Sequence, residues 1–352
     1  MEAAVMKSAF LESDVTILLK DLSGHITASD IAERERLIQN GGHYSETLAV
    51  EYEPSAEYLR LYQTALDRFA VKTAHAVAVV AEKIYALHGR GAVIASLARA
   101  GTPIGILIKR YAAARFGADW THYTISIIKG KGIDQNAMRY ILERHTAADV
   151  QFVDGWIGKG AIARELVDAT RQYDGLSPSL AVLSDPPRIA GVRGTVEDFL
   201  IPSSCLNAVV SGLLSRTILN QKLIGKNDFH GAVFYENLAP FNRTYEFINR
   251  IVENFPLNVN MEQDESIPID GAMNEIQRIK DDFSIPDVNL IKPGVGEATR
   301  VLLRRLPWKL LVYRRDDYAN LGHLYRLAEE RGVEISTYPL KNYRACGIIQ
   351  KI

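Results

Sequence analysis

Residues 149–166, DVQFVDGWIGKGAIAREL, place an acidic residue and a glycine-rich loop between an apolar run and a helical pattern. Such a turn presents free backbone N–H groups where a helix begins, and the helix dipole adds positive potential there. Asp154 ends the apolar run, at the carboxyl end of a strand, where open α/β sheets bind ligands. We therefore predict a phosphate site in which Asp154 and Lys159 act, with contacts from Gly155, Trp156, Ile157, Gly158, Gly160 and Ala161.

The spacing of these glycines disfavours two familiar nucleotide-binding loops. A P-loop requires G-x-x-x-x-G-K followed by Ser or Thr, whereas here Gly160 follows Lys159. The dinucleotide pattern G-x-G-x-x-G is absent as well. A glycine turn that only joins a strand to a helix is the alternative to a phosphate site.

A second loop of the same kind lies in SLARAGTPIG, residues 96–105. It again follows an apolar run and opens a helical pattern, with Arg99, Ala100, Gly101 and Thr102 at the turn. Two such loops at one sheet edge suit a ligand with two separated phosphate groups. Phosphoribosyl diphosphate has that shape.

Two further segments carry cations on glycine-containing turns. Lys129 and Lys131 lie in IIKGKGID, and Arg188 and Arg193 lie in PPRIAGVRGTVED. A mobile segment that closes over the ligand would let these cations neutralise it in the reacting state. Both segments read equally well as solvated surface turns.

The chain contains two cysteines, Cys205 and Cys346, which excludes a disulfide framework and a four-thiolate zinc site. Cys205 precedes an apolar helical pattern, and a thiol at a helix N-terminus can be a nucleophile. His230 and Asp228, in NDFHGA, would then supply the base and its orienting partner. The alternatives for Cys205 are a contact with the substrate and a small buried hydrophobic residue, and the latter is our expectation for Cys346. No histidine pair has metal-ligand spacing, so we expect no structural metal.

Short apolar runs at 92–98, 121–128, 149–155 and 180–187 alternate with helical patterns, which predicts an α/β domain with a parallel sheet. A long helix is expected after Pro54, a polar and helix-like region before it, and a small-residue helix after Cys205. Residues 255–290 read as a boundary, and a compact αβαβ unit follows. We predict two domains, residues 1–285 and 286–352.

The 352 residues are 47% hydrophobic and 24% charged, with a net charge of −1, so bulk charge does not suggest a protein that coats nucleic acid. The final unit nevertheless carries Arg304, Arg305, Lys309, Arg314 and Arg315, a set that suits RNA phosphates or a solvated surface. We expect no signal peptide, no membrane span and a cytoplasmic protein, and the sequence leaves oligomerisation open.

Several stretches together resemble one known family. VIASLARAGTPIG and VQFVDGWIGKGAIAREL resemble the diphosphate and 5′-phosphate loops of type I phosphoribosyltransferases, except that a single acid, Asp154, stands where two are usual. SDPPRIAGVRGTVEDFLIPSSCLNAVVSGLLSRT, DFHGAVFYENL and the tail from GEATRVLLRR resemble the phosphoribosyltransferase-like proteins of tellurite and stress-resistance operons. That family carries a C-terminal Pelota-type RNA-binding domain and also bears the name cysteine protease StiP.

The resemblance implies a phosphoribosyltransferase-like fold followed by a small αβ Pelota-like domain. It implies transfer of a phosphoribosyl group to a base-like acceptor, in nucleoside biosynthesis for a stress response, with Mg²⁺ on the diphosphate. Arg99 to Thr102 would hold the diphosphate, Asp154 the ribose hydroxyls and Gly155 to Ala161 the 5′-phosphate. Two alternatives travel with it: a cysteine protease that uses Cys205 with His230, and a non-catalytic protein that binds RNA through residues 286–352.

Overall fold

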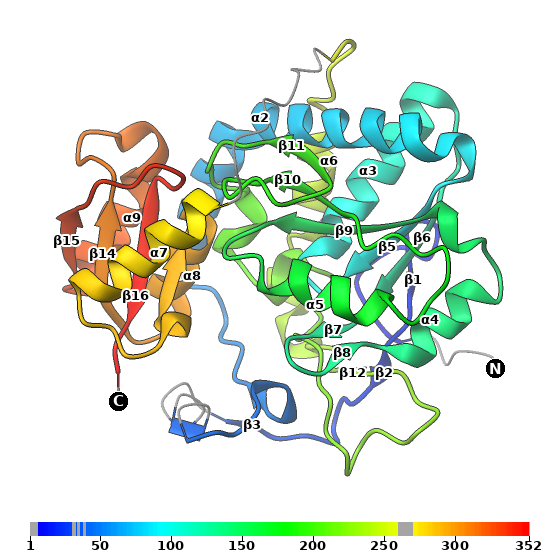
Figure 1. The fold of residues 1–352 in the computed structure, drawn as a ribbon, viewed down its shortest axis with the longest axis horizontal. Coiled ribbons are helices and arrows are strands. Elements are labelled where there is room, and N and C mark those ends of the chain that lie inside the picture. The colour runs from blue at the N-terminus through cyan, green and yellow to red at the C-terminus, as the bar shows by residue number, and fades with distance from the viewer. Residues whose placement is uncertain (1–5, 30–32, 34–35, 38–39, 260–269, 352) are drawn as a thin grey trace.

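The computed structural model describes residues 6–29, 33, 36–37, 40–259 and 270–351. Its main feature is a parallel sheet of six strands, which confirms the predicted α/β class (Figure 1). In spatial order the strands are β1 (Thr16–Ile17), β6 (Thr121–Ile125), β5 (Val93–Leu97), β9 (Val150–Trp156), β10 (Leu180–Ser184) and β11 (Val192–Thr195).

Helices cover both faces of this sheet, as its two-sided apolar strands require. Alternate residues of β5 show the two cores: Ile94 packs with α2 and α3, whereas Val93 packs with α4 and α5. On the first face lie α2 (Ala56–His88), α3 (Gly101–Phe116) and α6 (Thr244–Val252); on the second lie α4 (Gln135–Leu142) and α5 (Ala161–Thr170). Ser55 caps α2 by accepting a hydrogen bond from the Tyr58 N–H.

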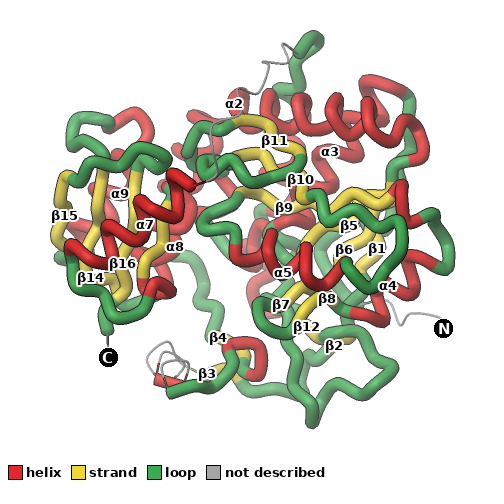
Figure 2. Tube along the Cα trace, viewed as in Figure 1, coloured by secondary structure: helices red, strands yellow, loops and turns green. Residues whose placement is uncertain are grey.

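Apart from residues 33 and 36–37, the described part of the N-terminal region up to residue 53 is not helical, contrary to the prediction. Residues 6–29 and 40–53 contain short strands and a 3-10 turn, and the stretch bearing β3 and β4 lies apart from the main sheet (Figure 2). These elements are β2 (Lys20–Asp21), β3 (Ala28–Ser29), η1 (Tyr44–Glu46) and β4 (Leu48–Ala49); β2 pairs with β12 (Gly231–Ala232), and β7 (Ile127–Ile128) pairs with β8 (Gly132–Ile133). The secondary structure of this region depends on pairing between segments that are distant in the sequence, and hydrophobic periodicity does not predict such pairing.

The helix expected after Cys205 is also wrong. Two 3-10 turns, η4 (Pro202–Cys205) and η5 (Ala208–Val210), occupy this stretch. Gly212 and Leu213 then adopt positive φ values of 70° and 59°, which no α-helix accommodates. The remaining 3-10 turns are η2 (Gly89–Gly91), η3 (Ala147–Asp149), η6 (Glu236–Phe241) and η7 (Val288–Leu290).

The C-terminal αβ domain has its own four-stranded sheet, in the order β13 (Ile291–Pro293), β16 (Ala345–Ile349), β14 (Pro307–Val312) and β15 (Glu334–Thr337). The predicted helices α8 (Val295–Arg304) and α9 (Tyr318–Glu330) are present, as are the predicted strands β14, β15 and β16. An additional helix, α7 (Asp270–Asp282), packs Ile276 and Ile279 into the core of this sheet. We therefore propose that the C-terminal domain begins at about residue 270.

The C-terminal domain is docked against the main domain through α8 and the loop before β16. The buried carboxylate of Asp198 accepts hydrogen bonds from the backbone N–H groups of Val295 and Arg344, each at 2.8 Å. Burial raises the pKa of Asp198 to about 6. The neighbouring Glu197 forms an ion pair with Arg344 at 3.0 Å. Asp198 thus caps the start of α8 across the domain boundary.

Candidate functional site

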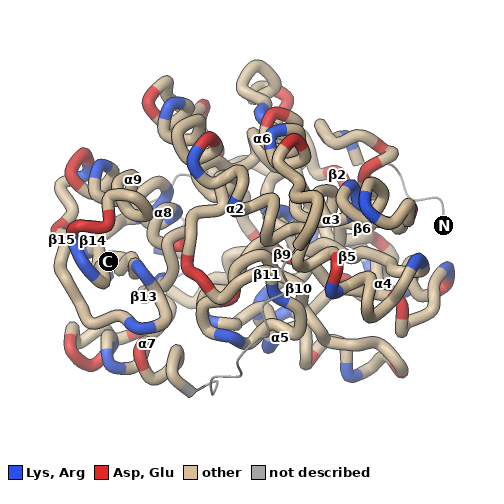
Figure 3. Tube along the Cα trace, turned by 90° about the horizontal axis from the view of Figure 1, so that it is seen from above, with Lys and Arg blue, Asp and Glu red and all other residues tan. Residues whose placement is uncertain are grey.

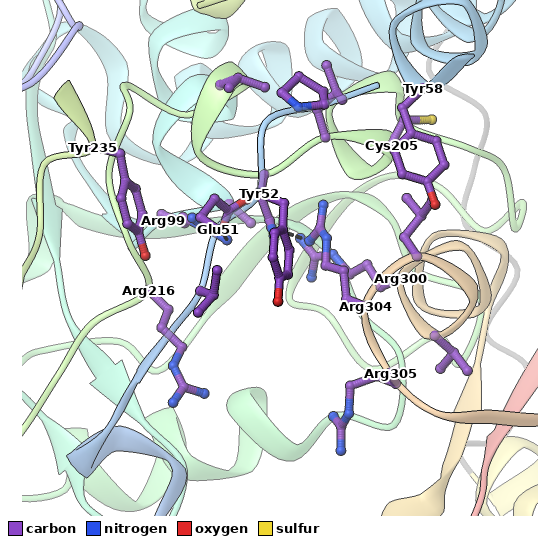
Figure 4. A pocket seen from close by; sticks show the side chains of 18 of the residues that line it. Glu51, Tyr52, Tyr58, Arg99, Cys205, Arg216, Tyr235, Arg300, Arg304 and Arg305 are labelled. Atoms are coloured by element: carbon purple, nitrogen blue, oxygen red, sulfur yellow. Dashed lines mark hydrogen bonds and ion pairs between the residues drawn. The ribbon is translucent and has the colours of Figure 1, made fainter. Parts of the chain in front are cut away.

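A cavity of about 490 Å³ lies between the two domains. Its walls come from the end of β5, Asp154 of β9, the segment 48–54, the η4–η5 stretch and α8. Figure 4 shows the side chains that line it, with arginines and tyrosines prominent. The cavity is the meeting place of elements that are far apart in the sequence.

Arg99 and Asp154 both line this cavity, because β5 and β9 are neighbours in the sheet. The Arg99 guanidinium donates to the Leu214 carbonyl at 2.6 Å and lies 3.5 Å from Glu51. Ala100 also lines the cavity, whereas Gly101 and Thr102 are buried beneath it at the start of α3.

Asp154 is a partly buried carboxyl whose Oδ1 accepts the Gly155 N–H at 2.7 Å. Burial raises its pKa to about 6, while that hydrogen bond and the positive charge of Arg300 act in the opposite direction. A carboxyl group with a pKa of about 6 is suited to exchanging a proton with a bound ligand.

Helix α8 contributes two arginines to the cavity wall, Arg300 and Arg304, which stand one helical turn apart. The Arg300 guanidinium stacks over Trp156, with its centre 4.4 Å from the ring, and lies 3.5 Å from Glu297. Arg304 donates to the side-chain oxygen of Asn207. Burial lowers the pKa of Arg304 to about 9, and the positive charges of Arg300 and Arg99 lower it further.

Cys205 lines the cavity at the end of η4 but is only 2% exposed. Burial raises its pKa to about 12, against a smaller opposing effect from the charge of Arg304. Helix α8 packs against η4. The thiol is therefore held protonated and covered in this arrangement, near the cations of α8.

The first predicted phosphate loop, residues 154–161, contacts the C-terminal domain, and most of it does not line the cavity. Within residues 154–161, the residue that lines the cavity is Asp154. The Gly158 carbonyl accepts the Tyr343 hydroxyl at 2.9 Å, and the Lys159 ammonium donates to the Val288 carbonyl at 2.5 Å. Burial lowers the pKa of Lys159 to about 8. The backbone expected to cradle a phosphate is thus used to dock the second domain.

The two segments expected to close over a ligand are instead held by contacts outside the cavity. The Glu165 carboxylate accepts the N–H groups of Gly130 and Gly132, and Lys129 reaches Asn289 at 2.9 Å, which fixes the turn that carries Lys131. Arg193 lies on the edge strand β11, 3.2 Å from Asp185. Neither pair of predicted cations, Lys129 with Lys131 or Arg188 with Arg193, lines the cavity.

The structure does not bring Cys205 and His230 together. The His230 ring is hydrogen-bonded to Ser126 at 2.8 Å, and its backbone N–H donates to Asp134. Asp228 instead pairs with Lys20 at 2.6 Å. Among the cavity-lining residues that the structure describes there is no histidine.

Sequence reasoning missed the α8 face and Glu51. Arg304 and Arg305 were assigned to an RNA surface, yet both line the cavity. The spacing of Arg300 and Arg304, four residues apart on an amphipathic helix, is the signal that places them on one face. Glu51, in an irregular stretch, carries no such signal.

Comparison with known proteins identifies the family of this chain. The profile described as "Tellurite-like stress resistance cysteine protease StiP" matches residues 8–252, and that of the "PELOTA RNA binding domain" matches residues 270–351. A protein from Acinetobacter baylyi named "Cysteine protease StiP" is 34% identical over 364 aligned positions, covering 98% of this chain and 94% of its own.

A hypoxanthine-guanine phosphoribosyltransferase from Bacillus anthracis aligns with 35% of this chain and 76% of its own at 18% identity, with a TM-score of 0.26 that supports no argument. Within the described residues, no helix combines the length and apolarity that crossing a membrane requires. Nor do three or more His, Cys, Asp or Glu side chains of the described part gather as metal ligands. By its family profile and its near full-length relative, this chain belongs to the StiP family of tellurite-like stress resistance proteins, with a C-terminal Pelota domain.

Proposed function

We propose that this chain is a cysteine peptidase in which Cys205 is the nucleophile. The observation that carries the assignment is the location of the two cysteines. Cys346 lies fully buried in the central strand β16 of the C-terminal sheet, whereas Cys205 lines the interdomain cavity. The name of the A. baylyi relative supports the class of reaction.

The chemistry would proceed in two steps. The sulfur of Cys205 attacks the carbonyl carbon of a peptide bond, and the C–N bond breaks as the thiol proton leaves with the amine. Water then hydrolyses the thioester, which releases the acid and restores the thiol. Because the thiol is 2% exposed and burial raises its pKa to about 12, the proposal requires Cys205 to become more exposed before the first step. We leave the base unassigned, since His230 lies elsewhere.

The test compares Cys205→Ser with Cys346→Ser in the full chain, using a fluorogenic peptide library and a mass-detected thiol electrophile. We expect cleavage and covalent labelling to be lost in Cys205→Ser and retained in Cys346→Ser. Cleavage that persists in Cys205→Ser would overturn the assignment.

A second candidate is a phosphoribosyl diphosphate site, favoured by Arg99 and Asp154 meeting at the ends of adjacent strands in one cavity. In it, Arg99 would contact the diphosphate and Asp154 the ribose hydroxyls, with Mg²⁺ bound to diphosphate oxygens. Diphosphate would be released as an acceptor attacks the sugar. Calorimetry with phosphoribosyl diphosphate and Mg²⁺ tests it: Asp154→Asn should weaken binding and Cys205→Ser should not. No heat of binding with the wild type ends this candidate.

We also propose that the C-terminal domain binds RNA, on the basis of its Pelota profile match. Figure 3 shows the positions of basic and acidic residues interspersed along the chain around α9 and β14, so binding would depend on local contacts. Arg314 is 57% exposed and suits a phosphate contact, whereas Arg304 faces the cavity. Fluorescence anisotropy with a labelled RNA hairpin should show weaker binding for Arg314→Gln at low salt, and unchanged binding would exclude this contact.

A further inference from the structure

The cavity beside Cys205 is a cationic chamber. Six of its lining residues are basic and four are acidic, counted from Arg99, Arg216, Lys292, Arg300, Arg304 and Arg305 against Glu51, Glu53, Asp154 and Glu297. Three of the guanidinium groups, those of Arg99, Arg300 and Arg304, repel one another electrostatically. Figure 4 shows Arg300 and Arg304 together, facing the space between Glu51 and Tyr58. Bringing these charges together is unfavourable unless anionic groups offset them.

The acidic residues already in the cavity neutralise only part of this positive charge. Glu51 lies 3.5 Å from Arg99, and Glu297 lies 3.5 Å from Arg300. Arg304 has a different partner, the neutral side-chain amide of Asn207. Helix α8 packs against η4, and Arg304 and Cys205 line the same cavity. Arg304 is thus the cation that is best placed to bind an acidic group of a substrate.

An acidic segment without regular secondary structure already forms part of the cavity wall. Residues 50–54, VEYEP, run along the cavity without regular secondary structure, and all five line it. Glu51 is largely buried within it, with a side chain 13% exposed, and attracts Arg304 as well as Arg99. A peptide with an acidic side chain would meet the same guanidinium groups.

We propose that the subsite next to Cys205 selects an acidic side chain of the peptide substrate, and that Arg304 of the C-terminal domain determines this specificity. This inference rests on the proposed peptidase function. The planar guanidinium can bind a carboxylate through two parallel hydrogen bonds, which an amide of the same shape cannot reproduce. Specificity would thereby reside in one domain and the nucleophile in the other.

The experiment uses the full chain and pairs of fluorogenic peptides that differ only by Glu against Gln, or Asp against Asn, at one scanned position. At one position we expect kcat/KM to favour the acid by at least about 30-fold, because an enclosed charge pair loses that much when one partner becomes neutral. In Arg304→Gln the ratio should fall to within about threefold. The control Arg278→Gln makes the same change at an exposed position of α7 in the same domain and should keep the wild-type ratio.

The acid-to-amide ratio is an internal control for folding and for thiol reactivity. Loss of Arg304 also removes a charge that favours the Cys205 thiolate, but that effect slows both peptides of a pair equally. Cleavage without an acidic preference, or a preference that survives in Arg304→Gln, would overturn the inference and leave the peptidase intact. No cleavage together with no labelling of Cys205 would reject both.

Discussion

Helix α8 of the docked C-terminal domain packs against η4, the turn that ends at the buried Cys205, which leads to a quantitative prediction for Asp198→Ala. Asp198 is 5% exposed and accepts two interdomain backbone hydrogen bonds, each 2.8 Å long. Its removal leaves two enclosed N–H groups without their acceptor, at about 1–3 kcal/mol each, and we expect a net loss of about 3 kcal/mol in docking free energy. Since 1.4 kcal/mol corresponds to a factor of ten, the open population should rise about 100-fold.

The assay is alkylation by iodoacetamide, followed separately for the two cysteine-containing peptides by mass spectrometry. Cys205 should react about 100-fold faster in Asp198→Ala when labelling proceeds through the open arrangement. Cys346, in the core of the C-terminal sheet, should keep its slow rate and so report that the domain remains folded. Glu197→Gln is the matched control, since this half-exposed carboxylate makes ion pairs worth about 1 kcal/mol or less.

An unchanged rate at Cys205 in a folded Asp198→Ala protein would refute the reasoning, because the thiol would then be covered by something other than docking. Equal acceleration at Cys205 and Cys346 would also refute it, since that pattern indicates global unfolding.

Three other predictions follow from individual residues. The pKa of Asp154 is raised from 3.8 to about 6, so its contribution to the free energy of unfolding is greatest at low pH and is lost as the pH rises from about 4 to 6. In urea unfolding, the wild type should therefore lose up to about 3 kcal/mol of stability relative to Asp154→Asn across that range. A difference between the two proteins that stays constant with pH would contradict this. Gly101→Ala should lower the free energy of unfolding by about 2 kcal/mol or more, because the new Cβ would lie 2.5 Å from the Val153 carbonyl oxygen, whereas Gly91→Ala, with open space around it, should change it by less than about 1 kcal/mol. Alkylation of Cys205 should keep accelerating up to pH 10 without a plateau, since its pKa is about 12; a plateau near pH 8 would show an activated thiol.

The sequence was most informative where local pattern and topology agree. The apolar runs of β5, β9 and β10 are buried on both faces, and the right-handed α/β connection places the ends of neighbouring strands at one edge. The approach of Arg99 to Asp154 could therefore be expected from two loops read in sequence. The order of the elements from α8 to β16 could be predicted because each one has a clear local helix or strand pattern.

The rest depended on contacts between distant segments. Nothing local to Gly158 or Lys159 indicates that Tyr343 and Val288 will occupy the loop's backbone and side chain. Likewise, the apolar residues after Cys205 fit a helical pattern, but Gly212 packs beside the Phe10 ring with positive φ, and this close approach selects turns. Glu51 enters the cavity from an irregular segment that no periodicity describes.

Helix α8 lies within the residues that match the Pelota profile. Its arginines nevertheless line the cavity that the main domain also forms. Dividing the chain between residues 252 and 270 would leave both profile matches whole, but it would separate Arg304 from Cys205. The junction between the two domains therefore brings together side chains that neither domain holds alone. Exchange of the tail between relatives should carry substrate preference with it.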